Sequence, residues 1–287
     1  MRINLNMKKL LLICILMIGS FFFKAQPFTF KSIGEAKEFR MTLYYGTNGK
    51  GAFVRYAGQK GIIPLRVKSY TTDTSGRSDG QPDIKHYVWE EIIDGKVNGT
   101  YQISEMLRTI EDVTYSRKKD GRQFRFEFVD EKSEKYDGSD QYLLYGALVS
   151  FNHFYNDRLT IDYPDGKKIN TELMSAENPD SARQSIIEDY NFDGYDDLGF
   201  SVPDAGMGVY RMFSIYLYNP KLKRFEKLKE PDYSKSNCSC LCDVTVSKKM
   251  KLLQTGCRGG ASWHQDIYRF DGKNELKWSS SKELKEE

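Results

Sequence analysis

The sequence predicts an all-β protein, and three observations lead to this prediction. Short runs rich in Tyr, Phe, Val and Ile recur along the chain, turns containing Gly, Asp and Asn separate them, and apolar residues rarely repeat with the period of a helix. Strands joined by tight turns in this way are typical of a hairpin-rich sandwich or of a propeller-like arrangement of small antiparallel sheets. We expect few helices, and short ones.

The first half of the chain contains a series of strand-like runs. The turns between them, such as residues 47–51 (TNGKG) and 118–122 (KKDGR), carry the Gly and Asn that hairpins need at positive φ. Short helices are expected at residues 104–112, which open on a capping serine, and at 177–188, which have an early proline. The expected strands lie within 37–46, 51–58, 62–72, 85–93, 99–107, 112–118 and 122–130.

The second half continues the same rhythm, and the apolar run from Leu143 to Phe151 marks the seam between the halves. We expect an N-terminal β-region at residues 26–150, a β-domain at 151–280 and a charged tail at 281–287 that frays. The expected strands of the second half lie within 157–169, 196–202, 209–228, 242–257 and 266–278.

Residues 1–25 predict a cleavable export signal. Lys8 and Lys9 supply the positive start, the apolar run from Leu10 to Phe23 follows, and Ala25 is a small residue where a signal peptidase would cut. The apolar run is shorter than the roughly 20 residues that cross a bilayer. We therefore expect a periplasmic or secreted protein whose mature chain has no membrane span. An uncleaved membrane anchor is the alternative.

The charge of the mature chain predicts no nucleic-acid partner. The full sequence has a formal net charge of +3. The signal segment contains four basic residues and no acidic one, so 39 basic residues remain against 40 acidic ones, a net charge of −1. Charges of both signs are interspersed, whereas proteins that bind nucleic acids gather basic residues on one face.

The stretch DYNFDGYDD, residues 189–197, has oxygen-bearing side chains at alternate positions and a glycine, Gly194, where a sharp turn is needed. Carboxylate, amide and backbone carbonyl oxygens are the ligands that Ca²⁺ prefers. Phe200 stands where a helix-loop-helix site needs glutamate, so the pattern is not an EF-hand. The expected calcium ligands are the side chains of Asp189, Asn191, Asp193 and Asp197 and the backbone carbonyl of Tyr195.

Two alternatives compete with a calcium site. The first is a metal-free hairpin turn rich in Asp and Asn, in which crowded carboxylates would repel one another and one would have to take up a proton. The second is catalysis, because a pair of carboxylates can cleave a glycosidic bond. Side chains that face a metal ion are not available to transfer protons, so we expect the metal to be structural.

Four cysteines follow the signal segment, all in one short C-terminal stretch, and an even number in an exported chain predicts disulfides. With a hairpin turn at residues 249–250, Cys242 lies opposite Cys257, and we expect these two to be joined. Cys238 and Cys240 are left for each other or for another pairing. A four-cysteine zinc site is the alternative, but the clustered cysteines lack the two-to-four-residue spacer that zinc sites use.

The stretch RGGASWH, directly after the last cysteine, is a candidate partner-binding loop. Arg258, Trp263 and His264 flank a pliable Gly-Gly pair, and Arg and Trp dominate the binding energy of many interfaces. In the alternative interpretation Trp263 fills core space while Arg258 and His264 are solvated. The order and local context of the residues reveal no Ser/His/Asp or Cys/His constellation, so we expect a protein that is not an enzyme.

The loop at residues 189–197 resembles the Asp-x-Asn-x-Asp-Gly-Tyr-x-Asp calcium loops of integrin-type FG-GAP repeats and related bacterial exported proteins. A longer resemblance covers about residues 155–278. The ordered motifs IEDYNFDGYDDLGF, YLYNPKLKRFEKL and GCRGGASWHQDIYRFDGKNELK look like the second half of a family of bacterial periplasmic proteins. The family is typified by immunity proteins that inhibit a lysozyme-like peptidoglycan hydrolase. This resemblance implies a propeller-like β-fold, bound calcium and a protein partner.

Together these observations predict an exported, calcium-stabilised protein that binds another macromolecule and inhibits a peptidoglycan hydrolase, in an immunity or lysozyme-inhibitor role. An adhesion or surface-assembly module is the first alternative, although such modules normally repeat the calcium loop and this chain has one copy. A secreted hydrolase is the second alternative. It would need a catalytic pair in a cleft and could draw on three histidines, His86, His153 and His264.

Overall fold

The computed structural model describes residues 27–75, 82–107, 109–129, 137–176, 182–206 and 208–284. Its regular structure consists of β-strands and two short 3₁₀ turns, η1 (Thr47–Gly49) and η2 (Tyr233–Lys235), which confirms the all-β prediction. The predicted export signal, residues 1–25, lies outside the described residues. Within the described ranges, no helix is long and apolar enough to cross a membrane.

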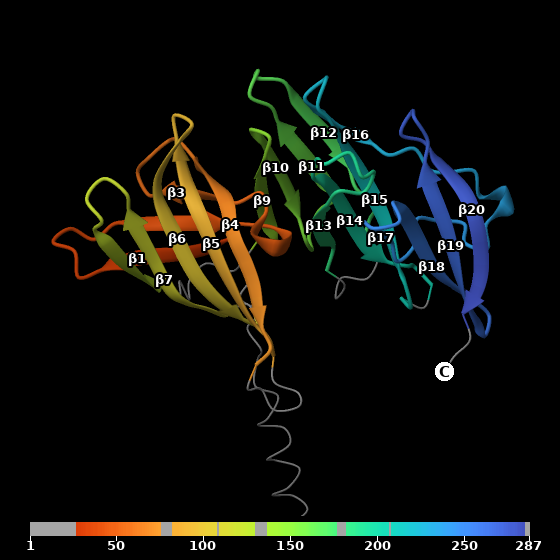
Figure 1. Ribbon diagram of the computed structural model, residues 1–287, viewed down its shortest axis with the longest axis horizontal. Coiled ribbons are helices and arrows are strands. Elements are labelled where there is room, and N and C mark those ends of the chain that lie inside the picture. Colours follow the sequence, from red (N-terminus) through yellow and green to blue (C-terminus); the bar gives the residue numbers. More distant parts are fainter. Residues whose placement is uncertain are drawn as a thin grey trace, which may run out of the picture.

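The N-terminal part is a closed antiparallel barrel of eight strands (Figure 1). Each strand pairs with the next along the chain, and β1 closes the barrel by pairing with β8. Closure pairs the two outermost strands, so neither is left as an open edge. The strands are β1 (Phe28–Ile33), β2 (Arg40–Tyr44), β3 (Phe53–Tyr56), β4 (Ile63–Asp73), β5 (Ile84–Ile93), β6 (Lys96–Met106), β7 (Thr109–Arg117) and β8 (Gln123–Phe128).

Alternate residues of the barrel strands point inward and form an aromatic core. Phe30, Trp89 and Tyr101 have no exposed surface. The indole N–H of Trp89 donates to the carbonyl of Gly49 in η1 at 2.7 Å, which satisfies the polar atom of this buried ring. The same bond fixes η1 against the barrel core, from where η1 reaches the second part of the molecule.

The second part consists of three four-stranded antiparallel sheets, which lie side by side in Figure 1. In each sheet the strands follow one another in chain order, which is the layout of a propeller blade. The first sheet contains β9 (Ser139–Leu144), β10 (Ala147–Asn152), β11 (Arg158–Asp162) and β12 (Lys168–Glu172). The second contains β13 (Gln184–Glu188), β14 (Asp197–Pro203), β15 (Arg211–Asn219) and β16 (Arg224–Lys227). The third contains β17 (Thr245–Ser247), β18 (Leu252–Gly259), β19 (Ser262–Phe270) and β20 (Leu276–Leu284).

The second sheet is buried on both faces, because it packs against the first sheet on one side and the third on the other. One hydrophobic cluster joins Leu198 and Phe200 of β14 to residues of the first sheet. Another joins Phe213 and Ile215 of β15 to Leu253 of the third sheet. This explains why β14 and β15 read as nearly continuous apolar runs rather than as alternating ones.

The structure differs from four expectations about elements and boundaries. The seam expected at residue 150 falls inside β10, since β9 and β10 form a hairpin of the first sheet. The helix expected at 104–112 is the β6–β7 hairpin, in which alternation buries Ile103 and Ile110 inside the barrel. Of the helix expected at 177–188, residues 184–188 form β13, and 177–181 lie outside the described residues. Of the tail, residues 281–284 belong to β20, and 285–287 are outside the described part.

The barrel and the sheets meet through the turn η1 and the residues that follow it. The hydroxyl of Thr47 accepts a hydrogen bond from the backbone N–H of Ile187 in β13 at 3.2 Å. The backbone N–H of Leu143 in β9 donates to the carbonyl of Gly51 at 2.9 Å. Gly51 has φ +63, and a Cβ there would lie 3.0 Å from the Cβ of Tyr142, so a larger residue would push the two parts apart.

The disulfide pairing expected between Cys242 and Cys257 is wrong, although the hairpin register on which it rested is confirmed. Val246 lies opposite Leu253, as predicted from the turn. The strand pairing ends at Thr245, however, because the preceding residues cross to the second sheet. There the backbone of Cys242 forms an isolated antiparallel β-bridge with Met212 of β15. The structure instead joins Cys238 to Cys257, with a Cα–Cα distance of 5.7 Å, and Cys240 to Cys242.

We expect peptide mapping without reduction to recover Cys238 joined to Cys257. Trypsin leaves Cys238, Cys240 and Cys242 on one peptide, residues 236–248, so fragmentation of that peptide must assign which of them is linked. Replacing both Cys238 and Cys257 by Ser should lower the free energy of unfolding by about 3 kcal/mol, because the unfolded chain then regains the freedom of the closed loop. A linkage from Cys242 to Cys257 would contradict the structure.

Candidate functional site

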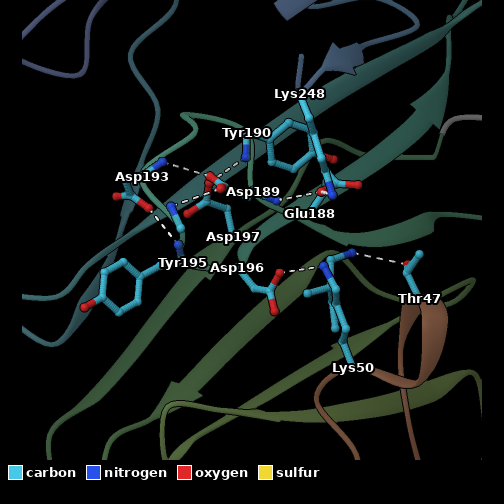
Figure 2. Close-up of polar contacts among 12 residues, drawn as sticks. Thr47, Lys50, Glu188, Asp189, Tyr190, Asp193, Tyr195, Asp196, Asp197 and Lys248 are labelled. Atoms are coloured by element: carbon cyan, nitrogen blue, oxygen red, sulfur yellow. Dashed lines mark hydrogen bonds and ion pairs between the residues drawn. The ribbon is translucent and has the colours of Figure 1, made fainter. Parts of the chain in front are cut away.

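The predicted calcium loop connects β13 to β14 at the centre of the second part, and its side chains fold back onto its own backbone (Figure 2). The carboxylate of Asp189 accepts hydrogen bonds from the N–H groups of Asp193 and Gly194, at 3.1 and 3.0 Å. The carboxylate of Asp193 accepts from the N–H of Tyr195 at 2.9 Å. Gly194 has φ +90, which only glycine adopts without strain.

Asn191 lies within the same turn. Its side-chain oxygen accepts from the backbone N–H of Asp193 at 3.3 Å. Its side-chain N–H donates at 3.0 Å to Oδ2 of Asp193, the carboxylate oxygen that Tyr195 does not bond. The side chains of Asp189 and Asn191 therefore meet at the backbone N–H of Asp193, and Asn191 also bonds the Asp193 carboxylate. Their convergence on a metal ion stays a prediction.

Asp197, the last of the predicted side-chain ligands, is buried and bonded to the backbone. It has no exposed surface, and its two carboxylate oxygens accept from the backbone N–H groups of Tyr190 and Tyr218, at 2.9 and 2.7 Å. Burial raises the pKa of Asp197 to about 7, the two backbone hydrogen bonds oppose this, and the nearby charges of Asp193 and Asp189 raise it further. Asp197 thus joins the two ends of the loop to β15, and each of its oxygens accepts one hydrogen bond from the backbone.

The loop contacts three other parts of the molecule. On the barrel side, Nζ of Lys50 lies 2.5 Å from Oδ1 of Asp196. On the first sheet, the hydroxyl of Tyr145 accepts from the backbone N–H of Asp196. Toward the third sheet, Nζ of Lys248 lies 2.8 Å from the carboxylate of Glu188, which directly precedes the loop. Figure 2 shows the two lysines approaching the loop. Partial burial acts to raise the pKa of Glu188. The hydrogen bonds from Lys248 and from the backbone N–H of Asp189, together with the charges of Lys50 and Lys248, outweigh burial, so the pKa is lowered.

The oxygens of the turn are suited to a hard cation. Each side-chain oxygen of Asp189, Asn191 and Asp193 accepts one hydrogen bond from the loop, and each has about two lone-pair positions, so one position per oxygen remains for a metal. In the described part of the chain, no group of three or more His, Cys, Asp or Glu side chains is already arranged around a metal position. The observed arrangement is a hydrogen-bonded turn whose donor set has the chemistry that Ca²⁺ selects.

The predicted partner-binding residues do not all share one face. Arg258 and Trp263 lie opposite each other at the end of the β18–β19 hairpin, next to a turn in which Gly260 has φ +62. Arg258 is exposed and Trp263 is partly exposed. His264 pairs with Cys257 instead, and successive strand residues point to opposite faces, so His264 faces the disulfide side. Its Nδ1 is buried and has no hydrogen-bond partner among the described atoms.

Sequence reasoning missed a polar cluster formed by His153, Asp140 and Arg183. Nε2 of His153 lies 3.2 Å from the Asp140 carboxylate, and Nδ1 lies 2.7 Å from the backbone carbonyl of Arg183. The Arg183 guanidinium is buried and donates to three backbone carbonyls and to Asp157. Burial raises the pKa of Asp140, and the contact with His153 opposes this. The spacing of residues in the sequence could not reveal the cluster, because its members come from three separate segments. Asp140 lies in β9, His153 follows β10, and Arg183 directly precedes β13.

We expect Asp197→Asn to lower the free energy of unfolding by about 1–3 kcal/mol. An asparagine offers one acceptor oxygen, so one of the two buried N–H groups that Asp197 satisfies would lose its partner. The measurement is urea unfolding at pH 8, where the pKa of about 7 leaves the wild-type carboxylate mainly ionised. Asp162→Asn, at an exposed ion pair with Lys168, is the matched control and should change stability by less than about 0.5 kcal/mol. Equal losses in both variants would contradict the role of Asp197.

Comparisons with known proteins identify no family for this chain. No protein-family model matches it, and no curated protein matches it. Among solved structures, a hypothetical selenium-binding protein from Sulfolobus tokodaii aligns with 91% of this chain and 76% of its own, at 9% sequence identity and a TM-score of 0.32. A likeness of this size carries no inference about the fold or activity of the chain.

Proposed function

We propose that this protein is an exported, calcium-stabilised binding protein that inhibits a peptidoglycan hydrolase. The observation that carries the proposal is the end of the β18–β19 hairpin. There Arg258 is exposed and has no ion-pair or hydrogen-bond partner among the described residues, and it lies directly opposite the partly exposed Trp263. An unpaired guanidinium beside an aromatic ring on a β-hairpin is the type of anchor that dominates protein interfaces.

The target class follows from the chemistry of this pair. Hydrolases that cleave glycosidic bonds carry two carboxyl groups in an open cleft. A guanidinium can form two parallel hydrogen bonds with one carboxylate, and an aromatic ring can occupy the place of a sugar. The inhibitor would thus block the cleft without being turned over. The resemblance of residues 155–278 to periplasmic immunity proteins supports the same target class.

Calcium has a structural role in this proposal. The loop at residues 189–197 brings Asp189 and Asp193 close to the buried Asp197, and their charges contribute to the raised pKa of Asp197. A cation held by the side chains of Asp189, Asn191, Asp193 and Asp197 and the backbone carbonyl of Tyr195 would offset this repulsion. Because the loop contacts the barrel, the first sheet and the third sheet, an ion here would stabilise the junction of all three.

We expect calcium to raise the melting temperature of the mature, metal-free protein. An ion at 100 times its dissociation constant stabilises the folded state by about 2.7 kcal/mol. Asp193→Ala should abolish the calcium-dependent shift, whereas Asp162→Ala, at an exposed site on β11, should retain it. Equal melting temperatures of the metal-free protein with calcium and with chelator would show that calcium does not stabilise it.

We expect the mature protein to inhibit lysozyme-like hydrolases from its own organism, measured as the rate of cell-wall lysis. Arg258→Ala and Trp263→Ala should each weaken inhibition by about 2 kcal/mol, or roughly 30-fold. Arg158→Ala, at the exposed start of β11, is the matched control and should inhibit like the wild type. Absence of inhibition by the wild type would overturn the function, while equal inhibition by all variants would overturn only the assigned hairpin.

A further inference from the structure

A cleft of about 410 Å³ lies where the barrel meets the first two of the small sheets. Barrel strands β1, β5 and β6 and the turn η1 form one wall, and the other wall comes from β9, the chain after β10, and the start of β13. The volume is in the range of pockets that bind small molecules. The cleft is built from other elements than the calcium loop and the β18–β19 hairpin.

Most polar groups of the sheet-side wall are already satisfied by the protein. Both ring nitrogens of His153 are engaged, one by Asp140 and one by the backbone carbonyl of Arg183. The hydroxyl of Tyr142 bonds that of Ser185 at 2.5 Å. Because neither nitrogen of His153 is free to accept a proton from a ligand, this wall is suited to binding rather than to acid–base catalysis.

On the barrel side of the cleft, by contrast, the opposite charges of Lys85 and Glu105 are not paired with each other. Lys85 in β5 and Glu105 in β6 are direct partners across the strand pair, and both line the cleft. Opposite charges at such positions commonly pair with each other. Here the side chain of Lys85 has no ion pair or hydrogen bond among the described residues, while that of Glu105 accepts a hydrogen bond from the hydroxyl of Tyr45 at 3.0 Å.

The carboxylate of Glu105 accepts hydrogen bonds from the phenols beside it. Tyr87 also hydrogen-bonds Glu105, and burial, followed by the charge of Glu105, raises the pKa of both Tyr45 and Tyr87. The phenols therefore remain protonated donors. They orient the carboxylate, and each of its oxygens can accept more than one hydrogen bond. The cleft thus offers one cation and one anion, each with capacity for a partner.

We propose that this cleft binds a small zwitterion, a free α-amino acid or a dipeptide. The ligand carboxylate would pair with Lys85 and the ligand ammonium group with Glu105, and Phe154, which is 37% exposed at the cleft, would contact an apolar side chain. Hydrogen bonds between charged groups are the strong ones. A ligand with a single charge would satisfy one protein group and be repelled by the other, so the pair selects for both charges together.

The first test uses the wild-type mature protein and needs no variant. L-Phenylalanine and L-alanyl-L-phenylalanine are titrated by calorimetry and by tryptophan fluorescence, beside their N-acetylated and C-amidated forms. Trp89 reports on the cleft because its ring stacks on that of Tyr87 at 5.2 Å. Each capped form should bind at least about tenfold more weakly, since each loses one charge-assisted hydrogen bond. Equal binding of capped and uncapped ligands, or no binding of any standard L-amino acid or of the dipeptide, would overturn the proposal.

The second test assigns each charge to its partner. Lys85→Met should bind the free and the C-amidated ligand equally well, while still discriminating against the N-acetylated form. Glu105→Gln should show the opposite pattern. Lys68→Met and Glu111→Gln, at exposed positions of β4 and β7, are the matched controls and should behave like the wild type. If both cleft variants keep the wild-type discrimination, the assignment of Lys85 and Glu105 is wrong. Thermal melts of each variant verify folding.

Discussion

The buried carboxylate of Asp197 is the constraint on which the second part of the molecule depends. One oxygen accepts from Tyr190, just inside the loop, and the other from Tyr218 in β15, so one side chain closes the loop and joins it to the central sheet. Two backbone N–H groups in a fully buried region would otherwise lack partners, which is costly. Asp266 in β19 has a similar role in the third sheet, where it accepts from the N–H groups of Asn237 and Cys238.

The position of the central sheet makes the loop important beyond its own residues. The central sheet packs against a sheet on each face, so a change in the loop between β13 and β14 would alter the packing of both hydrophobic clusters. The loop also reaches the barrel through Lys50 and Asp196. A metal ion at the loop would therefore stabilise several interfaces at once, since the groups it orders are shared among them. The two disulfides act at a different place, where the third sheet meets the start of β15.

The two proposed binding regions differ in the chemistry with which they would hold a ligand. At the end of the β18–β19 hairpin, a cation and an aromatic ring project from a turn and suit a protein surface with a carboxylate-lined cleft. At the junction with the barrel, Lys85 and Glu105 remain unpaired with each other because Tyr45 and Tyr87 hold the carboxylate. That junction exists because η1 bonds both Trp89 in the barrel core and Ile187 in the second sheet. The cleft is thus a consequence of how the two parts dock.

The sequence by itself determined the features that depend on neighbouring residues. Alternating apolar residues and Gly-containing turns predicted the all-β class, and the turn at residues 249–250 predicted the register of β17 and β18. Only the tertiary structure decided the barrel closure, the disulfide pairing, the structural role of Asp197, and the polar groups at the cleft. Each of these joins segments far apart in the chain, and which segments meet depends on sheet docking, which no local period or spacing encodes. Cys242 shows this directly: the hairpin register was right, but Cys242 forms a β-bridge with Met212 of β15 and a disulfide with Cys240.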